Sequence, residues 1–190
     1  MSRSDGFKKR KIAVLGARSV GKTSLVKQFV ENHFVDAYYP TIDNSVSKKV
    51  RHAGVEWDLE VFDTAGQDEF SIFNAKHAIG IHGYVLVYSI AAQGSFDMIQ
   101  IIYDKIVDFC GLKDIPCIIV GSKLDLEERR QISSTTARAL AEQCNSAWIE
   151  TSAKNNVNVG KVFELCLAEI DKRAVPSSPA TEKPGSCAVM

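Results

Sequence analysis

A glycine-rich segment near the N-terminus has the residue types needed to hold a chain of phosphates. Residues 16–23 read GARSVGKT and fit the pattern G-x-x-x-x-G-K-[ST]. Glycines let backbone N–H groups turn inward around phosphate oxygens, and a helix that follows points the positive end of its dipole at them. Lys22 can reach the terminal phosphates, and the Thr23 hydroxyl can bind Mg²⁺. The loop predicts a nucleotide site but does not choose between ATP and GTP.

Two later segments favour guanine as the base. In VGSKLD, at 120–125, the Asp125 carboxylate can accept hydrogen bonds from N1 and N2 of guanine, a pair of donors that adenine lacks. A site that leaves such a carboxylate unpaired rejects the wrong base strongly. The stem of Lys123 can lie over the ring, and TSAK at 151–154 can offer a backbone N–H to guanine O6. A P-loop kinase of small metabolites is the alternative, and these two segments argue against it.

Two further segments can sense whether the terminal phosphate is present. DTAGQ, at 63–67, follows a predicted strand, so that Asp63 can orient a water on Mg²⁺ and the Gly66 N–H can contact the γ-phosphate. Upstream, Thr41 ends the segment YYPT and can serve as a second hydroxyl ligand for Mg²⁺. Loss of the γ-phosphate would release both loops, which predicts a switch between GTP and GDP.

The elements that must position these segments are predicted from hydrophobic periodicity. The strands joined at Ala53-Gly54 form a predicted hairpin, and Ser133 is the expected cap of a helix. Alternating strands and helices imply a parallel sheet covered on both faces, with ligands at the carboxyl ends of its strands. Strands are expected at 11–15, 45–52, 55–62, 84–90, 115–120 and 147–149, and helices at 22–32, 96–109, 137–144 and 159–170.

Length and composition fit one soluble domain with a tail. The chain has 190 residues and no formal net charge, which argues against a general nucleic-acid binder. No apolar run approaches the roughly 20 residues of a membrane span, and the N-terminus is not a secretory signal. Five cysteines without C-x-x-C spacing argue against a disulfide framework or a zinc site. Residues 1–173 are expected to form the nucleotide-binding domain, and the proline-rich residues 174–190 a flexible tail.

These motifs, in this order over residues 11–173, resemble the Ras superfamily of small GTPases, and within it the Rheb-type members. The marks of that branch are ARSVGKTSL with Arg18, FVDAYYPTIDNS with Asn44, DTAGQDEFSIF and the terminal CAVM. The resemblance implies an α/β P-loop NTPase fold of the small G-protein type, with a six-stranded, mostly parallel sheet flanked by five helices. It also implies a GTP hydrolase that binds GTP or GDP with Mg²⁺ and activates a TOR-type kinase complex when GTP is bound.

The resemblance assigns a role to each matching position. The predicted catalytic residues are Tyr38, Thr41, Asp63, Gly66 and Gln67, and the predicted metal ligands are Thr23, Thr41 and Asp63. The predicted effector loop comprises Tyr38, Tyr39, Pro40, Thr41, Ile42, Asp43 and Asn44. The predicted nucleotide contacts are Arg18, Ser19, Val20, Gly21, Lys22, Thr23, Ser24, Phe34, Val35, Tyr38, Pro40, Thr41, Gly66, Ser122, Lys123, Asp125, Leu126, Ser152, Ala153 and Lys154.

Two positions modify what the resemblance implies. In Rheb-type members the glutamine that matches Gln67 is turned away from the attacking water, and Arg18 can crowd the place where a GTPase-activating protein inserts an arginine. The activator of these members is thought to supply an asparagine instead, assisted by the tyrosine at Tyr38. We therefore expect very slow hydrolysis, with a non-catalytic module that stays bound to GTP as the alternative. Ser122 replaces the family's asparagine, which predicts weaker nucleotide affinity without loss of base choice.

The chain ends in the C-a-a-X motif CAVM, in which Cys187 is the predicted prenylation site. Methionine in the last place favours recognition by farnesyltransferase. The tail has no second cysteine, and Lys183 is its only basic residue, whereas stable anchoring normally takes two signals. We expect reversible attachment to the cytoplasmic face of internal membranes, lysosome- or vacuole-like, with a cytosolic pool.

Overall fold

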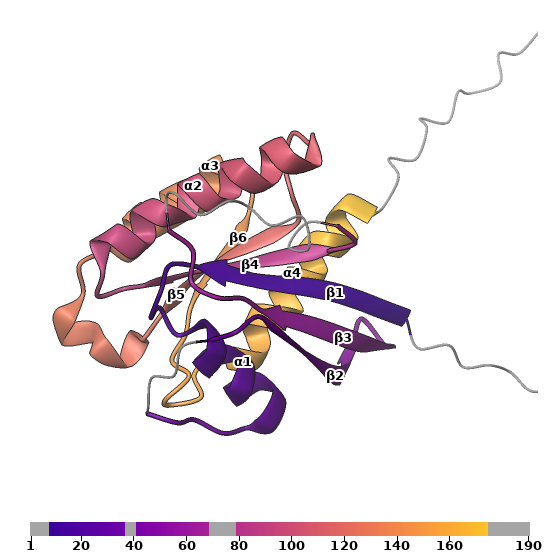
Figure 1. Cartoon of the computed structure of the whole chain (residues 1–190), viewed down its shortest axis with the longest axis horizontal. Coiled ribbons are helices and arrows are strands. Elements are labelled where there is room, and N and C mark those ends of the chain that lie inside the picture. The colour runs from indigo at the N-terminus through magenta and orange to yellow at the C-terminus, as the bar shows by residue number, and fades with distance from the viewer. Residues whose placement is uncertain (1–7, 37–40, 69–78, 175–190) are drawn as a thin grey trace, which may run out of the picture.

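The computed structural model describes residues 8–36, 41–68 and 79–174. Within these ranges, six strands form one sheet with four α-helices and one 3₁₀ helix around it (Figure 1). This confirms the predicted α/β fold with its six-stranded sheet and five helices. The strands are β1 Lys8–Gly16, β2 Asn44–His52, β3 Val55–Asp63, β4 Gly83–Ser89, β5 Cys117–Ser122 and β6 Ala147–Glu150. The helices are α1 Lys22–Glu31, α2 Gln93–Cys110, η2 Leu124–Arg129, α3 Ser134–Gln143 and α4 Val159–Ala174, where η2 is the 3₁₀ helix.

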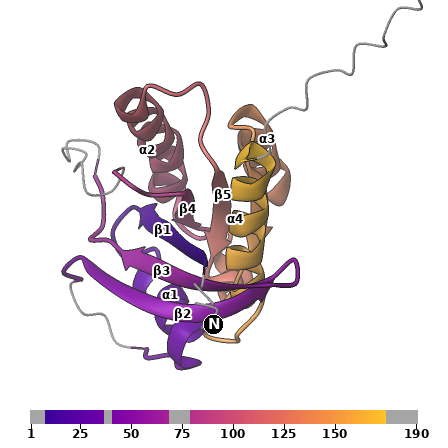
Figure 2. The ribbon, with the colours of Figure 1, turned by 90° about the vertical axis from the view of Figure 1, so that its right-hand side faces the viewer.

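The strand order is β2-β3-β1-β4-β5-β6, and Figure 2 shows β2, β3 and β1 one above another from the lower edge of the sheet. Only β2 runs antiparallel to its neighbour, because a two-residue turn joins it to β3. Ala53 and Gly54 both have positive φ, 49° and 78°, as a tight hairpin turn requires. The neighbouring pairs β1–β3, β1–β4, β4–β5 and β5–β6 are all parallel, so the carboxyl ends of these five strands meet at one edge of the sheet.

Two hydrophobic layers hold the helices against the sheet. Helices α1 and α4 cover one face, where the rings of Phe29 and Phe163 stack with centroids 3.8 Å apart. Helices α2 and α3 cover the other face, where Tyr88 meets Phe96 edge to face. The strand residues between the layers are fully buried in β4 and β5, as the continuous apolar runs predict. The core therefore fixes the strand ends from which the motifs emerge.

Strand β1 begins at Lys8, three residues before the predicted start at 11. The sequence does not predict a strand at residues 8–10, because this basic run shows no alternation of apolar and polar residues. In the fold, Lys8 pairs with Trp57 of β3, and the Arg10 guanidinium lies 4.5 Å from the centre of the Trp57 ring. Pairing and a cation–π contact thus extend the strand beyond its apolar part.

The described cysteines are all free thiols, with Cys117, Cys144 and Cys166 buried and Cys110 half-buried. No helix in the described ranges is long and apolar enough to cross a bilayer. Ser133 accepts a hydrogen bond from the Thr136 N–H at 3.0 Å, which confirms it as the cap of α3. Residue 174 closes α4, and the rest of the predicted tail, with Cys187, lies outside the described residues.

Candidate functional site

A cleft of about 570 Å³ opens at the carboxyl edge of the sheet, where ligands of open α/β sheets bind. Sixteen of the predicted nucleotide contacts line it, and they come from five separate segments of the chain. These are Arg18, Ser19, Gly21, Lys22, Thr23, Ser24, Phe34, Val35, Thr41, Gly66, Ser122, Lys123, Asp125, Leu126, Ala153 and Lys154. The fold therefore brings the motifs together around one cavity.

The loop between β1 and α1 surrounds one end of this cleft. Gly21 precedes α1 with a φ of 96°, a left-handed conformation that favours glycine. It carries no side chain to cap the helix, so that the first N–H groups of α1 are left for an external acceptor. The side chain of Lys22 folds back across the loop and donates to the carbonyls of Gly16 and Ala17 at 3.1 and 2.8 Å. Uncapped N–H groups beside a held ammonium form an anion site.

Burial makes the charged form of the Lys22 ammonium costly. The residue is only 5% exposed, and this burial lowers the pKa of Lys22 from 10.5 to about 8, although Asp63 and Asp43 act in the opposite direction. A phosphate group in the cleft would supply the missing negative charge. The charge balance of this end of the cleft therefore fits a polyanionic ligand.

Three oxygen donors beside Lys22 fit Mg²⁺. The Oγ1 atoms of Thr23 and Thr41 lie 2.8 Å apart, although the residues are 18 positions apart in the sequence. Asp63 is buried, and its Oδ1 atom has no hydrogen-bond partner. Burial raises the pKa of Asp63, while a hydrogen bond from Thr23 and the charge of Lys22 lower it. An unsatisfied buried carboxylate oxygen near two hydroxyls matches the oxygen ligands that Mg²⁺ prefers, directly or through water.

The two predicted sensing loops contact each other and the phosphate-binding loop. The Ala65 N–H donates to Asp43 Oδ1 at 2.6 Å, and Asn44 stands opposite Asp63 in the β2–β3 pair. The Gln67 N–H donates to the Gly16 carbonyl at 3.0 Å. A change at the terminal phosphate can therefore reach both loops at once.

The side chain of Gln67 does not point into the cleft. Its Nε2 atom donates to the Ala65 carbonyl at 3.3 Å, so that the amide folds back on its own loop. The next residue, Asp68, accepts a hydrogen bond from Arg18 at 3.3 Å across the cleft rim, with both side chains exposed. A Cβ at Gly66 would lie 2.4 Å from Arg18 Cγ, which explains why only glycine fits beside this arginine.

At the opposite end of the cleft, Asp125 is positioned by the last of the predicted segments. The Ser152 hydroxyl donates to Asp125 Oδ1 at 2.6 Å, and the Asn155 N–H donates to that hydroxyl at 3.1 Å. Lys123 has a positive φ of 63° and reaches back to the Ser19 carbonyl at 2.7 Å. The carboxylate is thus oriented while remaining exposed to the cleft, as recognition of a base requires.

The side chain of Ser122 contacts the phosphate-binding loop. Its buried hydroxyl contacts the carbonyls of Val20 and Tyr88, the latter at 2.8 Å. A hydroxyl has one proton and this one faces two protein carbonyls, so it serves the protein rather than a ligand. The shorter side chain at this position therefore still contacts the phosphate-binding loop, at Val20.

Some predicted residues lie elsewhere, and some lining residues were missed. Val20 is packed in the core, Ser152 is buried behind Asp125, and Asp63 lies beneath the cleft floor. Tyr38, Tyr39 and Pro40 fall outside the described residues. The missed lining residues are Leu25, Lys27, Asp36 and Thr151. Thr151 begins the predicted segment TSAK and Asp36 lies in FVDAYYPTIDNS, so both could have been included, whereas Lys27 stands in no motif and only the fold brings it to the cleft.

Comparison with known proteins agrees with this geometry. The family described as "Ras family" matches residues 11–172. The chain is 53% identical to the GTP-binding protein rhb1 of Schizosaccharomyces pombe, an alignment that covers 93% of this chain and 96% of that protein. It is 51% identical to the small monomeric GTPase RhbA of Aspergillus fumigatus, over 91% and 93% of the two chains. It is 46% identical to the human GTP-binding protein Rheb, over 96% and 98%.

Proposed function

This chain belongs to the Ras family of small GTPases, and from that premise we propose how its cleft works as a switch. The enzyme binds GTP or GDP with Mg²⁺ and hydrolyses GTP. One observation carries the assignment of residues: a single cleft is lined both by Lys22, beside the orphaned oxygen of the buried Asp63, and by the oriented carboxylate of Asp125. A nucleotide would bind with its phosphates at Lys22 and its base at Asp125.

Each side chain has a role in this proposal. Lys22 and the N–H groups at the start of α1 bind phosphate oxygens, and the Gly66 N–H binds the γ-phosphate. Thr23, Thr41 and Asp63 hold Mg²⁺, which supplies positive charge where negative charge develops on the phosphates. Departure of the γ-phosphate would release Thr41 and Gly66 together, because the Ala65–Asp43 contact couples their loops.

Intrinsic hydrolysis is slow in this proposal, because Gln67 cannot orient a water while its amide binds the Ala65 carbonyl. We expect purified protein to hydrolyse GTP in a single turnover at no more than about 10⁻⁴ s⁻¹. Gln67→Ala should change that rate by less than about threefold, since the side chain makes no transition-state contact. Rapid-quench measurement of phosphate release tests both the single-turnover rate and the small effect expected of Gln67→Ala. A rate near 1 s⁻¹, or a large fall in the variant, would contradict the proposal.

The same assay separates a regulated switch from a module that stays permanently bound to GTP. Addition of extract from the protein's own cells should accelerate hydrolysis severalfold or more if a GTPase-activating protein acts on it. The pairing of Arg18 with Asp68 at the rim favours an activator that does not insert an arginine there. No acceleration, together with GTP as the only nucleotide recovered from cells, would favour the non-catalytic alternative.

The GTP form is proposed to activate a TOR-type kinase complex through the effector loop. Ile42, 88% exposed, is the most exposed large apolar side chain among the described residues and follows Thr41 directly. Ile42→Asp should abolish kinase stimulation by the GTP-loaded protein while leaving GTP affinity unchanged, because Ile42 is not among the residues that line the cleft. Leu112→Asp is the matched control, at 53% exposure and beyond the far end of α2. Stimulation of a purified kinase complex is the measurement, and an equal loss in both variants would refute this role.

Attachment to internal membranes is proposed to depend on a farnesyl group at Cys187. Cys187→Ser should leave the protein in the soluble fraction after lysis, because the sequence of residues 174–190 has no second cysteine that could carry a lipid. Cys110→Ser, at a half-buried thiol, is the control and should fractionate like the unmodified sequence. Membrane flotation followed by immunoblotting gives the result. Persistent sedimentation of the Cys187 variant with membranes would reveal a different anchor.

A further inference from the structure

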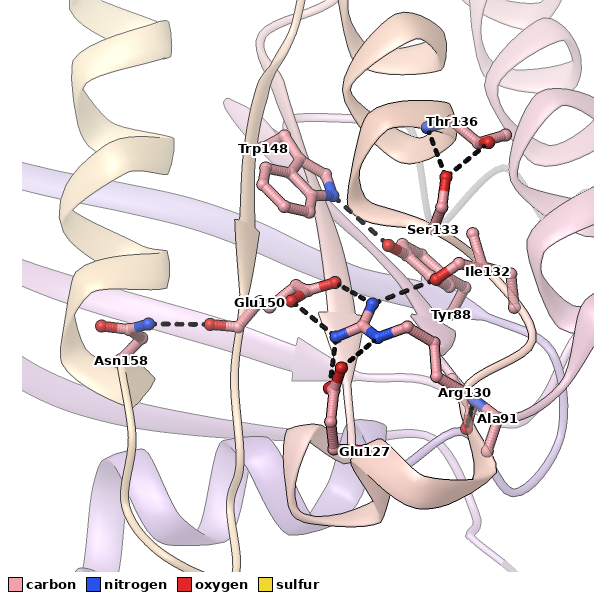
Figure 3. Close-up of polar contacts among 11 residues, drawn as sticks. Tyr88, Ala91, Glu127, Arg130, Ile132, Ser133, Thr136, Trp148, Glu150 and Asn158 are labelled. Atoms are coloured by element: carbon pink, nitrogen blue, oxygen red, sulfur yellow. Dashed lines mark hydrogen bonds and ion pairs between the residues drawn. The ribbon is translucent and has the colours of Figure 1, made fainter.

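One arginine outside the nucleotide motifs joins the two segments that surround the base end of the cleft. Figure 3 shows Arg130 between the carboxylates of Glu127 and Glu150. Its Nε and Nη2 atoms donate to the two oxygens of Glu127 at 2.8 and 2.6 Å. Its Nη1 and Nη2 atoms donate to the two oxygens of Glu150 at 2.6 and 3.0 Å, and Nη1 also donates to the Ile132 carbonyl at 3.0 Å. All five N–H donors of the guanidinium are therefore used.

The two carboxylates belong to different loops of the cleft. Glu127 lies in η2, two residues after Asp125, while Glu150 ends β6, two residues before Ser152. Inside the cleft these loops are joined by the Ser152–Asp125 hydrogen bond of 2.6 Å. Arg130 supplies a second, charged connection behind it. The distance between the loops, and with it the position of the Asp125 carboxylate, is fixed from both sides.

Glu150 provides a rigid support for this connection. Its side chain is 14% exposed, and its backbone carbonyl accepts a hydrogen bond from Asn158 at 2.9 Å. A Cβ at Gly121 would lie 3.1 Å from Glu150 Cγ and 2.7 Å from the Tyr88 hydroxyl, so β5 leaves room for both side chains only because glycine is there. The Tyr88 hydroxyl is in turn held by Trp148 Nε1 at 3.3 Å. Glu150 therefore cannot easily move when a partner is lost.

From this geometry we propose that Arg130 is a positioning residue for guanine recognition, which holds the loop of Asp125 against the loop of residues 151–154 and thereby slows the release of GDP. The inference rests on the proposed assignment of Asp125 to the base. A base leaving the cleft must separate the two loops, and that separation opposes two bidentate ion pairs of a single planar guanidinium. Lysine has no such fork and cannot bind both carboxylates in this way.

The test measures GDP release and base choice in Arg130→Ala and Arg130→Lys. Protein loaded with a fluorescent GDP derivative is chased with excess GDP, and both variants should release it about tenfold faster. The affinity ratio of GDP to inosine diphosphate should also fall, because inosine lacks the N2 amino group that a correctly placed Asp125 accepts from. A residue that only stabilised the fold would not change this ratio.

Two further variants separate positioning from general stability. Arg173→Ala removes an arginine of the same 19% side-chain exposure that also binds two carboxylates, Glu169 at 2.8 Å and Asp114 at 3.1 Å, at the end of α4 remote from the cleft. Arg173→Ala should lower the melting temperature without changing the rate of GDP release or the affinity ratio of GDP to inosine diphosphate. Glu127→Ala removes a carboxylate that is 62% exposed, so it should fold normally and still release GDP severalfold faster.

Each outcome decides one point. The inference is overturned if Arg130→Ala and Glu127→Ala both leave the rate of GDP release and the affinity ratio of GDP to inosine diphosphate unchanged. If Arg130→Ala does not fold, the result for Glu127→Ala decides alone. Faster release in Arg173→Ala to the same extent would overturn it as well. Failure of the proposed base site is seen separately, as a wild-type protein that binds GDP and inosine diphosphate with equal affinity, or as an Asp125→Ala variant that keeps the wild-type preference for GDP.

Discussion

Asp125→Asn is expected to exchange the base preference of the cleft from guanine to xanthine nucleotides. The carboxylate accepts from N1–H and N2–H of guanine, whereas an asparagine amide would place its own N–H₂ against that amino group. Xanthine has a carbonyl at the same position and can accept from the amide. Loss of a charged acceptor and an unpaired donor together should weaken GDP binding by about a thousandfold. Competition binding with GDP and xanthosine diphosphate is the measurement.

The substitution is nearly isosteric, so the surroundings of the side chain should persist. The Ser152 hydroxyl can still donate to the retained carbonyl oxygen at Oδ1. Glu128→Gln removes a carboxylate from the exposed side of the same 3₁₀ helix and serves as the control, with unchanged preference expected. A guanine preference that survives in Asp125→Asn would remove the basis for assigning the base to this end of the cleft.

Lys22→Met is expected to abolish measurable nucleotide binding, because no other ammonium reaches the phosphates from within the loop. Two hydrogen bonds from a charged donor contribute about 1.5–3 kcal/mol each, so affinity should fall at least about a hundredfold. Thr23 and Asp63 would also lose the balancing charge beside them. Equilibrium dialysis with GDP is the measurement, and binding within tenfold of the unmodified protein would contradict the role of Lys22.

The lowered pKa of Lys22 adds a dependence on pH. Burial lowers this pKa to about 8 in the empty cleft, and phosphate groups would raise it. Binding of GDP should therefore take up most of one proton at pH 9 and much less at pH 7, with affinity falling as the pH rises above about 8. Calorimetry in buffers of different ionisation enthalpy measures this uptake. A value near zero at pH 9 would show that Lys22 is already paired in the empty protein.

The stability of the empty protein has the opposite dependence. The unfolded chain keeps the Lys22 proton up to the ordinary value of 10.5, so the penalty for burying the charge is complete below pH 8 and disappears as the pH rises from 8 to 10.5. Buried groups such as Cys117 and Tyr88, whose pKa values burial raises to about 12, act the other way at high pH. The difference between wild type and Lys22→Met isolates the contribution of the lysine.

Much of the site was predictable because its chemistry depends on short, contiguous segments. In the glycine loop, VGSKLD and TSAK, the groups that contact the nucleotide lie within a few residues of one another. Each segment follows a strand whose apolar composition predicts that it is buried. Since parallel strands end at one edge of a sheet, the motifs had to meet. The orientation of Gln67 is different, because its contact with Ala65 depends on a loop conformation that the sequence pattern does not encode.

The sequence by itself determined the order of elements, the position of the phosphate and base motifs, and the kind of nucleotide they favour, since these follow from local periodicity and residue type. Only the tertiary structure decided the long-range pairings. It gave Thr23 its neighbour Thr41, turned Ser122 toward Val20, and brought Glu150 to Arg130. Contacts between residues 18 to 102 positions apart depend on how the layers pack, and no periodicity along the chain records that geometry.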